Sequence, residues 1–258
     1  MISANGVSFH VGKKVLLQPT DVHFEEGRFH VIMGANGAGK STLLKVLSGD
    51  QEPSTGNVSL GGKDLAVYGK KALALKRAVL SQHYHVTFPI TVKDVVLMGR
   101  YPFYEANPTA HDRQICQKAM ALMEVEKFAG RDYTTLSGGE AQKVQMSRVL
   151  SQIWNEAGEE GKVLFLDEPV SHLDVKYQYQ LMRIAKDFCR QKTTVIAILH
   201  DINLAIAFAD RILFMKEGEI RHVVEDATQI TPAIIEDTFG VPSTILRESN
   251  HPKPIVVF

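Results

Sequence analysis

The chain has 258 residues, with 29 Lys and Arg, 29 Asp and Glu, and two cysteines. This length allows one large or two modest domains with a sizeable core, and the ordinary composition argues against a disordered, collagen-like or disulfide-stabilised scaffold. The formal net charge of zero gives no bulk attraction to nucleic acid or to anionic lipid. Cys116 and Cys189 form no C-x-x-C pair, which favours buried free thiols in a reducing compartment over a structural zinc site.

The N-terminal segment has no basic stretch followed by an apolar one, so we expect no secretory signal. A membrane-spanning helix needs about 20 consecutive apolar residues. The best apolar runs, at 163–166 and 195–199, are much shorter. We therefore expect a chain that is soluble by itself and that reaches a membrane only through a partner.

The first part of the chain predicts strands, tight turns and one helix. Residues 29–33 are mostly apolar and end at Gly34, which indicates a buried strand that leads into a glycine loop. Leucines then recur at helical spacing until Gly49, the expected end of a helix. Residues 53–56 predict a turn, and residues 58–60 predict a strand before a reversal.

From about residue 86 the pattern becomes helical. One helix is predicted over 111–124 and another over 137–154, each with one apolar face. The two faces consist of Ile115, Ala119, Leu122 and Met123, and of Met146, Val149, Leu150, Ile153 and Trp154. The acidic stretch 155–161 contains glycine and predicts a surface loop.

Strand patterns then return. Residues 163–166 and 194–199 are continuous apolar runs, as expected for parallel strands that are covered on both faces, and 177–188 predicts a helix between them. Residues 211–224 predict a hairpin, followed by a proline-containing tail with a short helix. This order predicts an α/β core with a helical subdomain inserted near residues 86–160.

Residues 34–41, Gly-Ala-Asn-Gly-Ala-Gly-Lys-Ser, fit the phosphate-loop pattern GxxxxGK[ST] between a predicted strand and a predicted helix. The glycines allow backbone N–H groups to surround phosphate oxygens, and the helix directs its positive N-terminus at the same anion. Lys40 is expected to reach the β- and γ-phosphates and Ser41 to bind Mg²⁺. A chance glycine loop is the alternative, which the strand–loop–helix context disfavours. The predicted nucleotide contacts are Gly34, Ala35, Asn36, Gly37, Ala38, Gly39, Lys40, Ser41 and Thr42.

An apolar strand ends in two carboxylates, Asp167 and Glu168. Adjacent side chains at a strand end point in different directions, so the two can have different roles. Asp167 suits the metal shell, directly or through water, and Glu168 suits polarising an attacking water. The alternative is a pair of solvated acids at the end of a strand.

Residues 136–140, Leu-Ser-Gly-Gly-Glu, predict a second anion-binding loop before a helix. Ser137 and Glu140 alone would make a capping box, which needs no ligand. A capping box does not require Gly138 and Gly139, whereas close approach of the backbone to an anion does. Both interpretations are compatible, because the cap orients the same helix N-terminus.

Together these segments resemble the Walker A, Walker B and signature motifs of the ATP-binding subunits of ABC transporters, over nearly the whole chain. The resemblance implies a P-loop NTPase fold of the ABC type, with an inserted helical subdomain and an antiparallel β portion. It implies one domain over 1–258, whose RecA-like core spans about 1–85 and 161–225. The helical subdomain would span about 86–160 and a C-terminal tail about 226–258.

The resemblance also implies further site residues. Gln82 corresponds to the Q-loop, which senses Mg²⁺ and contacts the membrane partner; residues 171–174 correspond to the D-loop with Asp174; and His200 corresponds to the switch histidine at the γ-phosphate. In the family two copies enclose two ATP molecules, so Ser137 and Gly139, with Gly138 between them, would contact the nucleotide of the other copy. ATP and Mg²⁺ are the implied ligands, Glu168, His200 and Lys40 the implied catalytic residues, and Ser41, Gln82 and Asp167 the implied metal site.

The chain departs from the family pattern in two places. An aromatic residue usually stacks on adenine near position 11, where this chain has Val11 after Phe9 and His10. The stretch between Glu140 and Asp167 is several residues longer than usual. Separately, His83 and His85 could bind a metal or haem, or could be a solvated pair near the transmembrane partner.

Residues 91–102 and 239–242 resemble the ABC ATPases that serve uptake of iron, haem and cobalamin. Residues 147–154, with the acidic loop that follows, most resemble the haem importers of this subgroup. The implied protein is the ATP-hydrolysing motor of a haem importer at the cytoplasmic face of the bacterial cell membrane. Its implied partners are a second copy, permease subunits and, indirectly, a periplasmic haem-binding protein. Alternatives are a siderophore or cobalamin importer, or a soluble ABC regulator; the single cassette and the absence of a basic excess or heptad run disfavour the last, and we expect no nucleic-acid partner.

Overall fold

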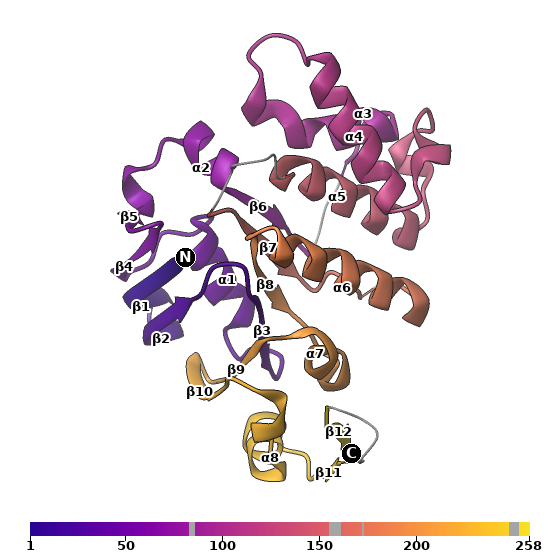
Figure 1. Ribbon diagram of the computed structural model, residues 1–258. Coiled ribbons are helices and arrows are strands. Elements are labelled where there is room, and N and C mark those ends of the chain that lie inside the picture. The colour runs from indigo at the N-terminus through magenta and orange to yellow at the C-terminus, as the bar shows by residue number, and fades with distance from the viewer. Residues whose placement is uncertain (83–85, 155–160, 172, 248–252) are drawn as a thin grey trace.

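The structure is a computed structural model that describes residues 1–82, 86–154, 161–171, 173–247 and 253–258. Its centre is a six-stranded sheet with the order β10-β9-β3-β8-β7-β6, which is parallel from β9 to β6 and antiparallel between β9 and β10 (Figure 1). The bounds of these strands are β3 Phe29–Gly34, β6 Arg77–Leu80, β7 Val163–Asp167, β8 Thr194–Ile198, β9 Arg211–Lys216 and β10 Glu219–Val224.

Two smaller antiparallel sheets flank this centre. A four-stranded sheet has the order β2-β1-β4-β5, and a two-stranded sheet lies in the C-terminal tail. Their bounds are β1 Ile2–Val11, β2 Lys14–Phe24, β4 Thr55–Leu60, β5 Lys63–Asp64, β11 Thr244–Leu246 and β12 Ile255–Val257. The predicted turn at 53–56 is therefore wrong for its second half, because Thr55 and Gly56 begin β4, and Thr55 pairs with Ser8 of β1.

The helices lie around the sheets, with α3, α4 and α5 gathered beyond β6 and β7 at one end of the molecule (Figure 1). Their bounds are α1 Lys40–Ser48, α2 Lys70–Lys76, α3 Val92–Leu97, α4 Ala110–Leu122, α5 Gly138–Ile153, α6 Val175–Arg190, α7 Ile202–Phe208 and α8 Pro232–Phe239. Short 3₁₀ helices span Leu65–Val67, Met98–Phe103, Glu126–Phe128, Tyr133–Thr135 and Ala227–Gln229. No helix among the described residues has both the length and the apolar character needed to cross a membrane.

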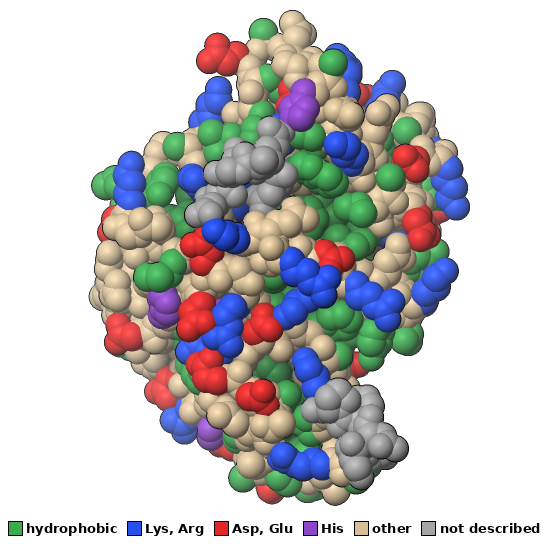
Figure 2. Space-filling view, in the orientation of Figure 1, with side chains coloured by type: hydrophobic (Ala, Val, Ile, Leu, Met, Phe, Trp, Pro, Cys, Tyr) green, Lys and Arg blue, Asp and Glu red, His purple; other side chains and the backbone are tan. Residues whose placement is uncertain are grey.

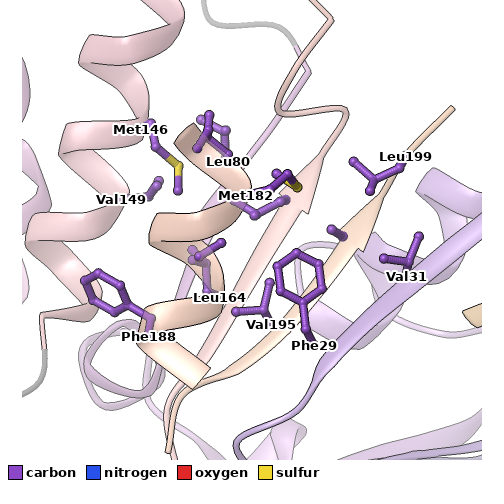
Figure 3. Close-up of a cluster of buried hydrophobic side chains, with 14 of the residues drawn as sticks. Phe29, Val31, Leu80, Met146, Val149, Leu164, Met182, Phe188, Val195 and Leu199 are labelled. Atoms are coloured by element: carbon purple, nitrogen blue, oxygen red, sulfur yellow. The ribbon is translucent and has the colours of Figure 1, made fainter. Parts of the chain in front are cut away.

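The six-stranded sheet has a hydrophobic cluster on each face. Alternate residues of β3 belong to different clusters: Phe29 and Val31 face one side and Ile32 the other. The first cluster packs against α5 and α6 (Figure 3), and the second packs against α1 and the four-stranded sheet. Coverage on both faces explains the continuous apolar runs of β7 and β8, as the sequence predicted, and β3 is likewise buried along its whole length although it contains His30.

The first cluster also contains side chains of α3, α4 and α5, so one continuous hydrophobic region joins the inserted helices to the sheet. The division of the chain into a core and a helical subdomain therefore stays a prediction. One predicted face needs correction: Leu122 is 38% exposed, whereas Cys116 and Met120 are buried. At about 100° per residue, Leu122 lies at the edge of the face that α4 buries.

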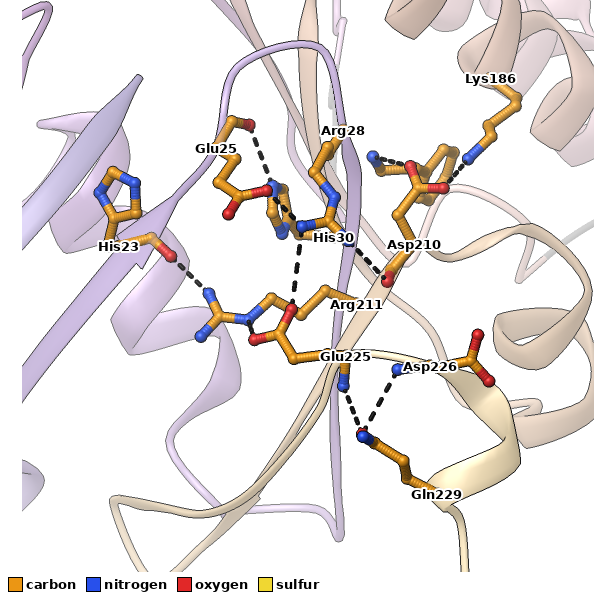
Figure 4. A network of polar contacts seen from close by, with 11 residues as sticks. His23, Glu25, Arg28, His30, Lys186, Asp210, Arg211, Glu225, Asp226 and Gln229 are labelled. Carbon is orange, nitrogen blue, oxygen red and sulfur yellow. Dashed lines mark hydrogen bonds and ion pairs between the residues drawn. The ribbon is translucent and has the colours of Figure 1, made fainter.

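Charged side chains join three elements at the edge of the sheet opposite the glycine loop (Figure 4). Arg211 of β9 donates to the carbonyl of His23 in β2 and forms an ion pair of 2.7 Å with Glu225. Asp210 pairs with Lys186 of α6 and accepts a hydrogen bond from the backbone N–H of Phe29. The network therefore connects the four-stranded sheet, the six-stranded sheet and α6. On the side of the molecule that Figure 2 shows, acidic and basic side chains are intermixed.

Candidate active site

The predicted site residues follow neighbouring strands of the six-stranded sheet. The glycine loop follows β3, Asp167 and Glu168 lie at the end of β7, and His200 follows β8. Gln82 follows β6. Because these strands are parallel, their carboxyl ends meet at one edge of the sheet, where the ligands of open α/β sheets bind. The topology thus brings the four segments together.

Two glycines of the loop are required by close backbone contacts. Gly34 has φ +152°, and a Cβ there would lie 2.2 Å from the carbonyl oxygen of Met215. Gly39 caps α1 with φ +97°, and a Cβ there would lie 2.7 Å from the carbonyl oxygen of Leu16. The N–H of Gly218, in the β9–β10 turn, donates to the carbonyl of Ala38 at 3.0 Å. The loop is therefore enclosed by β2 and β9, which leaves no room for a side chain at Gly34 or Gly39.

Lys40 begins α1 and is only 6% exposed. Its ammonium donates to the carbonyls of Gly34 at 2.9 Å and Ala35 at 3.0 Å. Burial lowers the pKa of Lys40, although the nearby carboxylates of Glu168 and Asp167 oppose this shift. The arrangement holds a positive charge against the backbone of the loop.

Ser41 and Asp167 lie side by side although 126 residues separate them in the chain. The hydroxyl of Ser41 donates to Oδ1 of Asp167 at 3.3 Å. Burial raises the pKa of Asp167, and the neighbouring charge of Glu168 adds to this, whereas the bond from Ser41 opposes it. A half-buried hydroxyl and a buried carboxylate are oxygen ligands of the kind that Mg²⁺ takes from proteins, so this pair fits a magnesium ion.

The carboxylates of Asp167 and Glu168 have different partners. Oε1 of Glu168 lies 2.6 Å from Nε2 of His200, and its Oε2 accepts a hydrogen bond of 2.8 Å from Nε2 of Gln82. Glu168 has φ +51°, a left-handed conformation that is unfavourable for a residue with a Cβ. The backbone at the end of β7 is thus held in a strained turn that directs this side chain toward Gln82 and His200.

A cleft of about 820 Å³ lies between the glycine loop, Glu168 and His200, whereas Gly34, Ala35 and Asp167 are not in its described lining. This volume is within the usual range of small-molecule sites, roughly 300–1,000 Å³. The described lining residues predicted from the sequence are Asn36, Gly37, Ala38, Gly39, Lys40, Ser41, Thr42, Gln82, Glu168 and His200. The lining also contains residues that the sequence did not predict, namely Lys14, Val15 and Leu16 of β2 and Glu217 and Gly218 of the β9–β10 turn.

These additional residues lie far from the motifs in sequence, and no local pattern marks them. Val15 is half exposed in this part of the cleft. Val11, at the position where the resemblance places an aromatic residue, is exposed and is absent from the described lining. The apolar surface that this end of the cleft offers therefore comes from Val15 and Leu16.

The predicted signature and D-loop residues are placed apart from the cleft lining. Ser137 and Glu140 form a reciprocal capping box at the start of α5, as the sequence predicted, and Gly138 and Gly139 begin the helix after it. Asp174 caps α6 by accepting from the N–H of Tyr177 at 3.1 Å. The predictions for His83, His85, His172 and the loop 155–160 fall outside the described residues.

Comparison with known proteins agrees with this geometry. Residues 17–171 match the family described as ABC transporter. Hemin import ATP-binding protein HmuV of Gloeobacter violaceus is 39% identical over 257 residues, which cover 100% of this chain and 94% of that protein. The protein of the same name from Rhodopseudomonas palustris (strain BisB5) is 42% identical, over 96% of this chain and 94% of that protein.

A solved structure supports the fold and the chemistry. It is a dimeric ATP-binding cassette in a post-hydrolysis state with ADP and Pi, with a TM-score of 0.75 and 25% identity over 87% of this chain and 98% of that one. The predicted α/β fold of the ABC type is therefore confirmed, as is the predicted ATPase class. With a family match over more than half of its length and relatives matched over nearly all of it, the chain belongs to the ABC transporter family and is a nucleotide-binding, ATP-hydrolysing subunit.

Proposed function

We propose that this chain is the motor subunit of a haem importer. The observation that carries the proposal is the full-length similarity to relatives that are named hemin import ATP-binding proteins, at 39% and 42% identity. The cleft supports the motor part, because it combines a phosphate loop, a buried lysine and two carboxylates with different surroundings. Nothing in a cytoplasmic ATPase must touch the cargo, so the substrate rests on similarity and not on the geometry of the cleft.

The glycine loop and Lys40 bind the triphosphate in this proposal. The N–H groups of residues 34–39 and the N-terminus of α1 provide partial positive charge, and Thr42 extends the contact into the first turn of the helix. Lys40 supplies a full charge to the β- and γ-phosphates. Its bonds to the carbonyls of Gly34 and Ala35 support this assignment, because they fix the ammonium within the loop.

Ser41, Asp167 and Gln82 hold Mg²⁺ in this proposal. When bound, the ion neutralises charge on the β- and γ-phosphates. The hydroxyl of Ser41 and the carboxylate of Asp167 are already adjacent. Since Nε2 of Gln82 is engaged by Glu168, its amide oxygen is the atom left for the ion.

Glu168 polarises the attacking water, and His200 contacts the γ-phosphate. The support is their mutual distance of 2.6 Å, which places a carboxylate and an imidazole on the same side of the cleft. A water that Glu168 activates must compete with His200 and Gln82 for the two carboxylate oxygens. Binding of nucleotide at the P-loop therefore has to draw these two side chains toward the phosphate and the metal.

Two copies assemble around two nucleotides, and Ser137, Gly138 and Gly139 of each copy complete the site of the other. Two observations support this: the solved relative is a dimer, and the capped start of α5 is separate from the cleft of its own chain. Asp174, at the start of α6, is assigned to the same junction. Residues 86–160 serve as the helical subdomain and 226–258 as the C-terminal tail.

The dimer works at the cytoplasmic face of the cell membrane as a peripheral component. There it drives permease subunits, which receive haem from a periplasmic binding protein. Transport follows from a difference in the affinity of the ATP-bound and nucleotide-free dimer for two states of the permease. Under this proposal haem meets the permease and the binding protein, and the motor has no specific haem site.

The test of the chemistry is Glu168→Gln. We expect this variant to bind ATP with nearly unchanged affinity, to form an ATP-bound dimer and to lose turnover, because only the carboxylate that activates water is removed. ATP affinity, dimerisation and hydrolysis are measured in parallel. Turnover close to that of the unaltered protein would remove Glu168 from the proposed role.

The test of the cargo is reconstitution of this chain with the permease and binding protein encoded beside it. ATP-dependent uptake of haem, a ferric siderophore and cobalamin is measured in the same vesicles. We expect haem uptake and no uptake of the others. Uptake of siderophore or cobalamin alone would refute the haem assignment and leave the motor assignment intact. Haem uptake should persist when His83→Ala and His85→Ala are combined, and its specific loss would assign that pair a role in haem transfer.

A further inference from the structure

Side-chain hydrogen bonds fasten α5 to other parts of the molecule at separate points along its length. Near its start, Nε2 of Gln142 donates to the carbonyl of Pro169 at 2.9 Å. Farther along, Arg148 donates to the carbonyl of Val79 at 3.3 Å, and Gln152 donates to the carbonyl of Arg77 at 3.0 Å. The last two bonds hold the edge strand β6. The bond from Gln142 is different, because it reaches the turn that carries Glu168.

Among the described residues, the turn is held in part by its own backbone. Glu168 has φ +51°, and its carbonyl accepts from the backbone N–H and the hydroxyl of Ser171 at 3.4 and 3.3 Å. Pro169 has no N–H to donate, so its carbonyl is the one backbone hydrogen-bonding group that this residue offers. The amide of Gln142 supplies the donor. It therefore fixes the peptide between Pro169 and Val170, one residue beyond Glu168, from outside the turn.

Gln142 lies on the same helix as the capping box of Ser137. The two residues are five positions apart, which corresponds to about 7.5 Å along the helix axis. The half-buried side chain of Gln142 and the rigid first turns of α5 thus join the Leu-Ser-Gly-Gly loop to the Glu168 turn within one chain. A shift of the loop is transmitted to Pro169 without passing through the nucleotide.

We propose that Gln142 is a positioning residue that couples the Leu-Ser-Gly-Gly loop to the carboxylate of Glu168. Contact of the loop with the nucleotide of the second copy then sets the orientation of the Glu168 carboxylate relative to the attacking water. This inference rests on the roles proposed above for Glu168 and Ser137. It adds a residue that the sequence analysis did not single out and that is not in the described lining of the cleft.

The experiment compares three substitutions in the full chain. Gln142→Met keeps the length of the side chain and removes the donor. Gln142→Glu keeps the shape and places a carboxylate against the carbonyl of Pro169. Gln142→Lys restores a donor on a longer stem. Gln180→Met is the matched control, because it removes an equivalent glutamine bond, from α6 to Glu124 at 3.0 Å, away from the cleft.

We expect Gln142→Met to lower kcat by about 10- to 100-fold. The lower value corresponds to the loss of one hydrogen bond, and the upper value to misplacing a reacting group by about 1 Å. ATP affinity and the midpoint of thermal unfolding should stay near those of the unaltered protein. Gln142→Glu should be at least as slow, Gln142→Lys should recover part of the loss, and Gln180→Met should match the unaltered protein.

Two results would overturn the inference. One is a kcat for Gln142→Met within twofold of the unaltered protein. The other is a joint fall of kcat, ATP affinity and unfolding temperature, which would assign Gln142 a structural role only. Glu168→Gln is measured alongside: if it is inactive while Gln142→Met is normal, only the coupling fails, and if it turns over normally, the proposed function of Glu168 fails first.

Discussion

Gln82 and Glu168 are joined by a hydrogen bond of 2.8 Å, from the amide nitrogen of the first to Oε2 of the second. The bond links the segment after β6 to the end of β7, and it fixes which end of the Gln82 amide is free. Because the nitrogen is engaged, the oxygen is available to a cation. In the proposed function, Gln82 therefore contacts both the metal ion and Glu168, so the metal site and the water-activating carboxylate share the side chain of Gln82.

Gln82→Ala should increase the Mg²⁺ concentration that hydrolysis requires. The substitution removes an oxygen ligand, and it also removes the partner of Oε2 in Glu168. We expect the half-saturating Mg²⁺ concentration to rise about tenfold, which corresponds to about 1.4 kcal/mol. The measurement is hydrolysis against Mg²⁺ at fixed ATP. Removal of Mg²⁺ by a chelator should stop hydrolysis by the unaltered protein, and an unchanged Mg²⁺ dependence in the variant would exclude Gln82 from the metal shell.

Lys40→Ala should weaken both nucleotide binding and hydrolysis. Phosphoryl transfer depends on positioning and on charge stabilisation, and Lys40 is the positive side chain held within the loop. We expect a loss of ATP affinity of at least about tenfold and a larger loss of turnover. Calorimetric titration with ATP and a phosphate-release assay check this. Normal binding with impaired turnover would place the lysine at the transferred phosphate only.

Ser137→Arg should prevent ATP-dependent dimerisation and hydrolysis while each P-loop still binds ATP. The substitution puts a bulky cation where the second copy's γ-phosphate should approach. Mixing this variant with Lys40→Ala protein should restore at most one composite site per dimer, because only one pairing keeps both the P-loop and the signature intact. Light scattering and hydrolysis of the mixture test this. Dimers with normal hydrolysis from Ser137→Arg alone would show that the loop does not act across an interface.

The glycines of the P-loop should differ in their tolerance of a methyl group. Gly34→Ala places a Cβ 2.2 Å from the carbonyl oxygen of Met215, so β3 and β9 must separate. We expect a loss of about 2–4 kcal/mol in the free energy of unfolding. Gly37→Ala meets no atom within 4 Å and has φ +80°, so it should cost only about 1 kcal/mol of backbone strain. Denaturant unfolding of the two variants gives the comparison, and equal losses would contradict it.

Much of the site could be predicted because its residues follow strand ends. Once 29–33 and 163–166 are assigned as parallel strands, Ser41 and Asp167 must come to the same edge, although 126 residues separate them. The antiparallel strands were harder to predict from the sequence. β1 has register shifts against β2, which break the alternation of apolar residues, and β11 and β12 have three residues each, too few to show a period.

Contacts between side chains on unrelated elements could not be predicted at all. Gln142 carries no local signal that it reaches Pro169, because a glutamine on a helix is most often solvated. The same applies to Val15, which joins the cleft only because β2 passes behind Gly39. Spacing identifies residues that belong to one motif, and the packing of distant segments decides what else surrounds them.

His30 lies in β3, on the face of the sheet opposite Phe29. Its ring is fully buried, Nε2 lies 3.1 Å from the carbonyl oxygen of Glu25, and the ring packs edge-on against Phe24. Burial lowers the pKa of His30 to about 4 from 6.5; the bond to Glu25 and the charge of Asp210 act in the opposite direction, and Arg211 and Arg28 add to the lowering. The folded protein therefore keeps this imidazole neutral where the unfolded chain would protonate it.

Between pH 6.5 and about 4 the unfolded state consequently binds more protons than the folded state, so stability falls as the pH falls through this window. The loss attributable to His30 is about 3 kcal/mol, from about 1.4 kcal/mol per pH unit. His30→Gln keeps a donor for Glu25 but cannot be protonated, so its free energy of unfolding should change less with pH over this range. His10→Gln is the control, because His10 is exposed on β1 and folding does not remove it from water. Urea unfolding at several pH values gives the slopes, and a slope for His30→Gln equal to that of the unaltered protein would show that His30 is protonated in the folded state as readily as in the unfolded one.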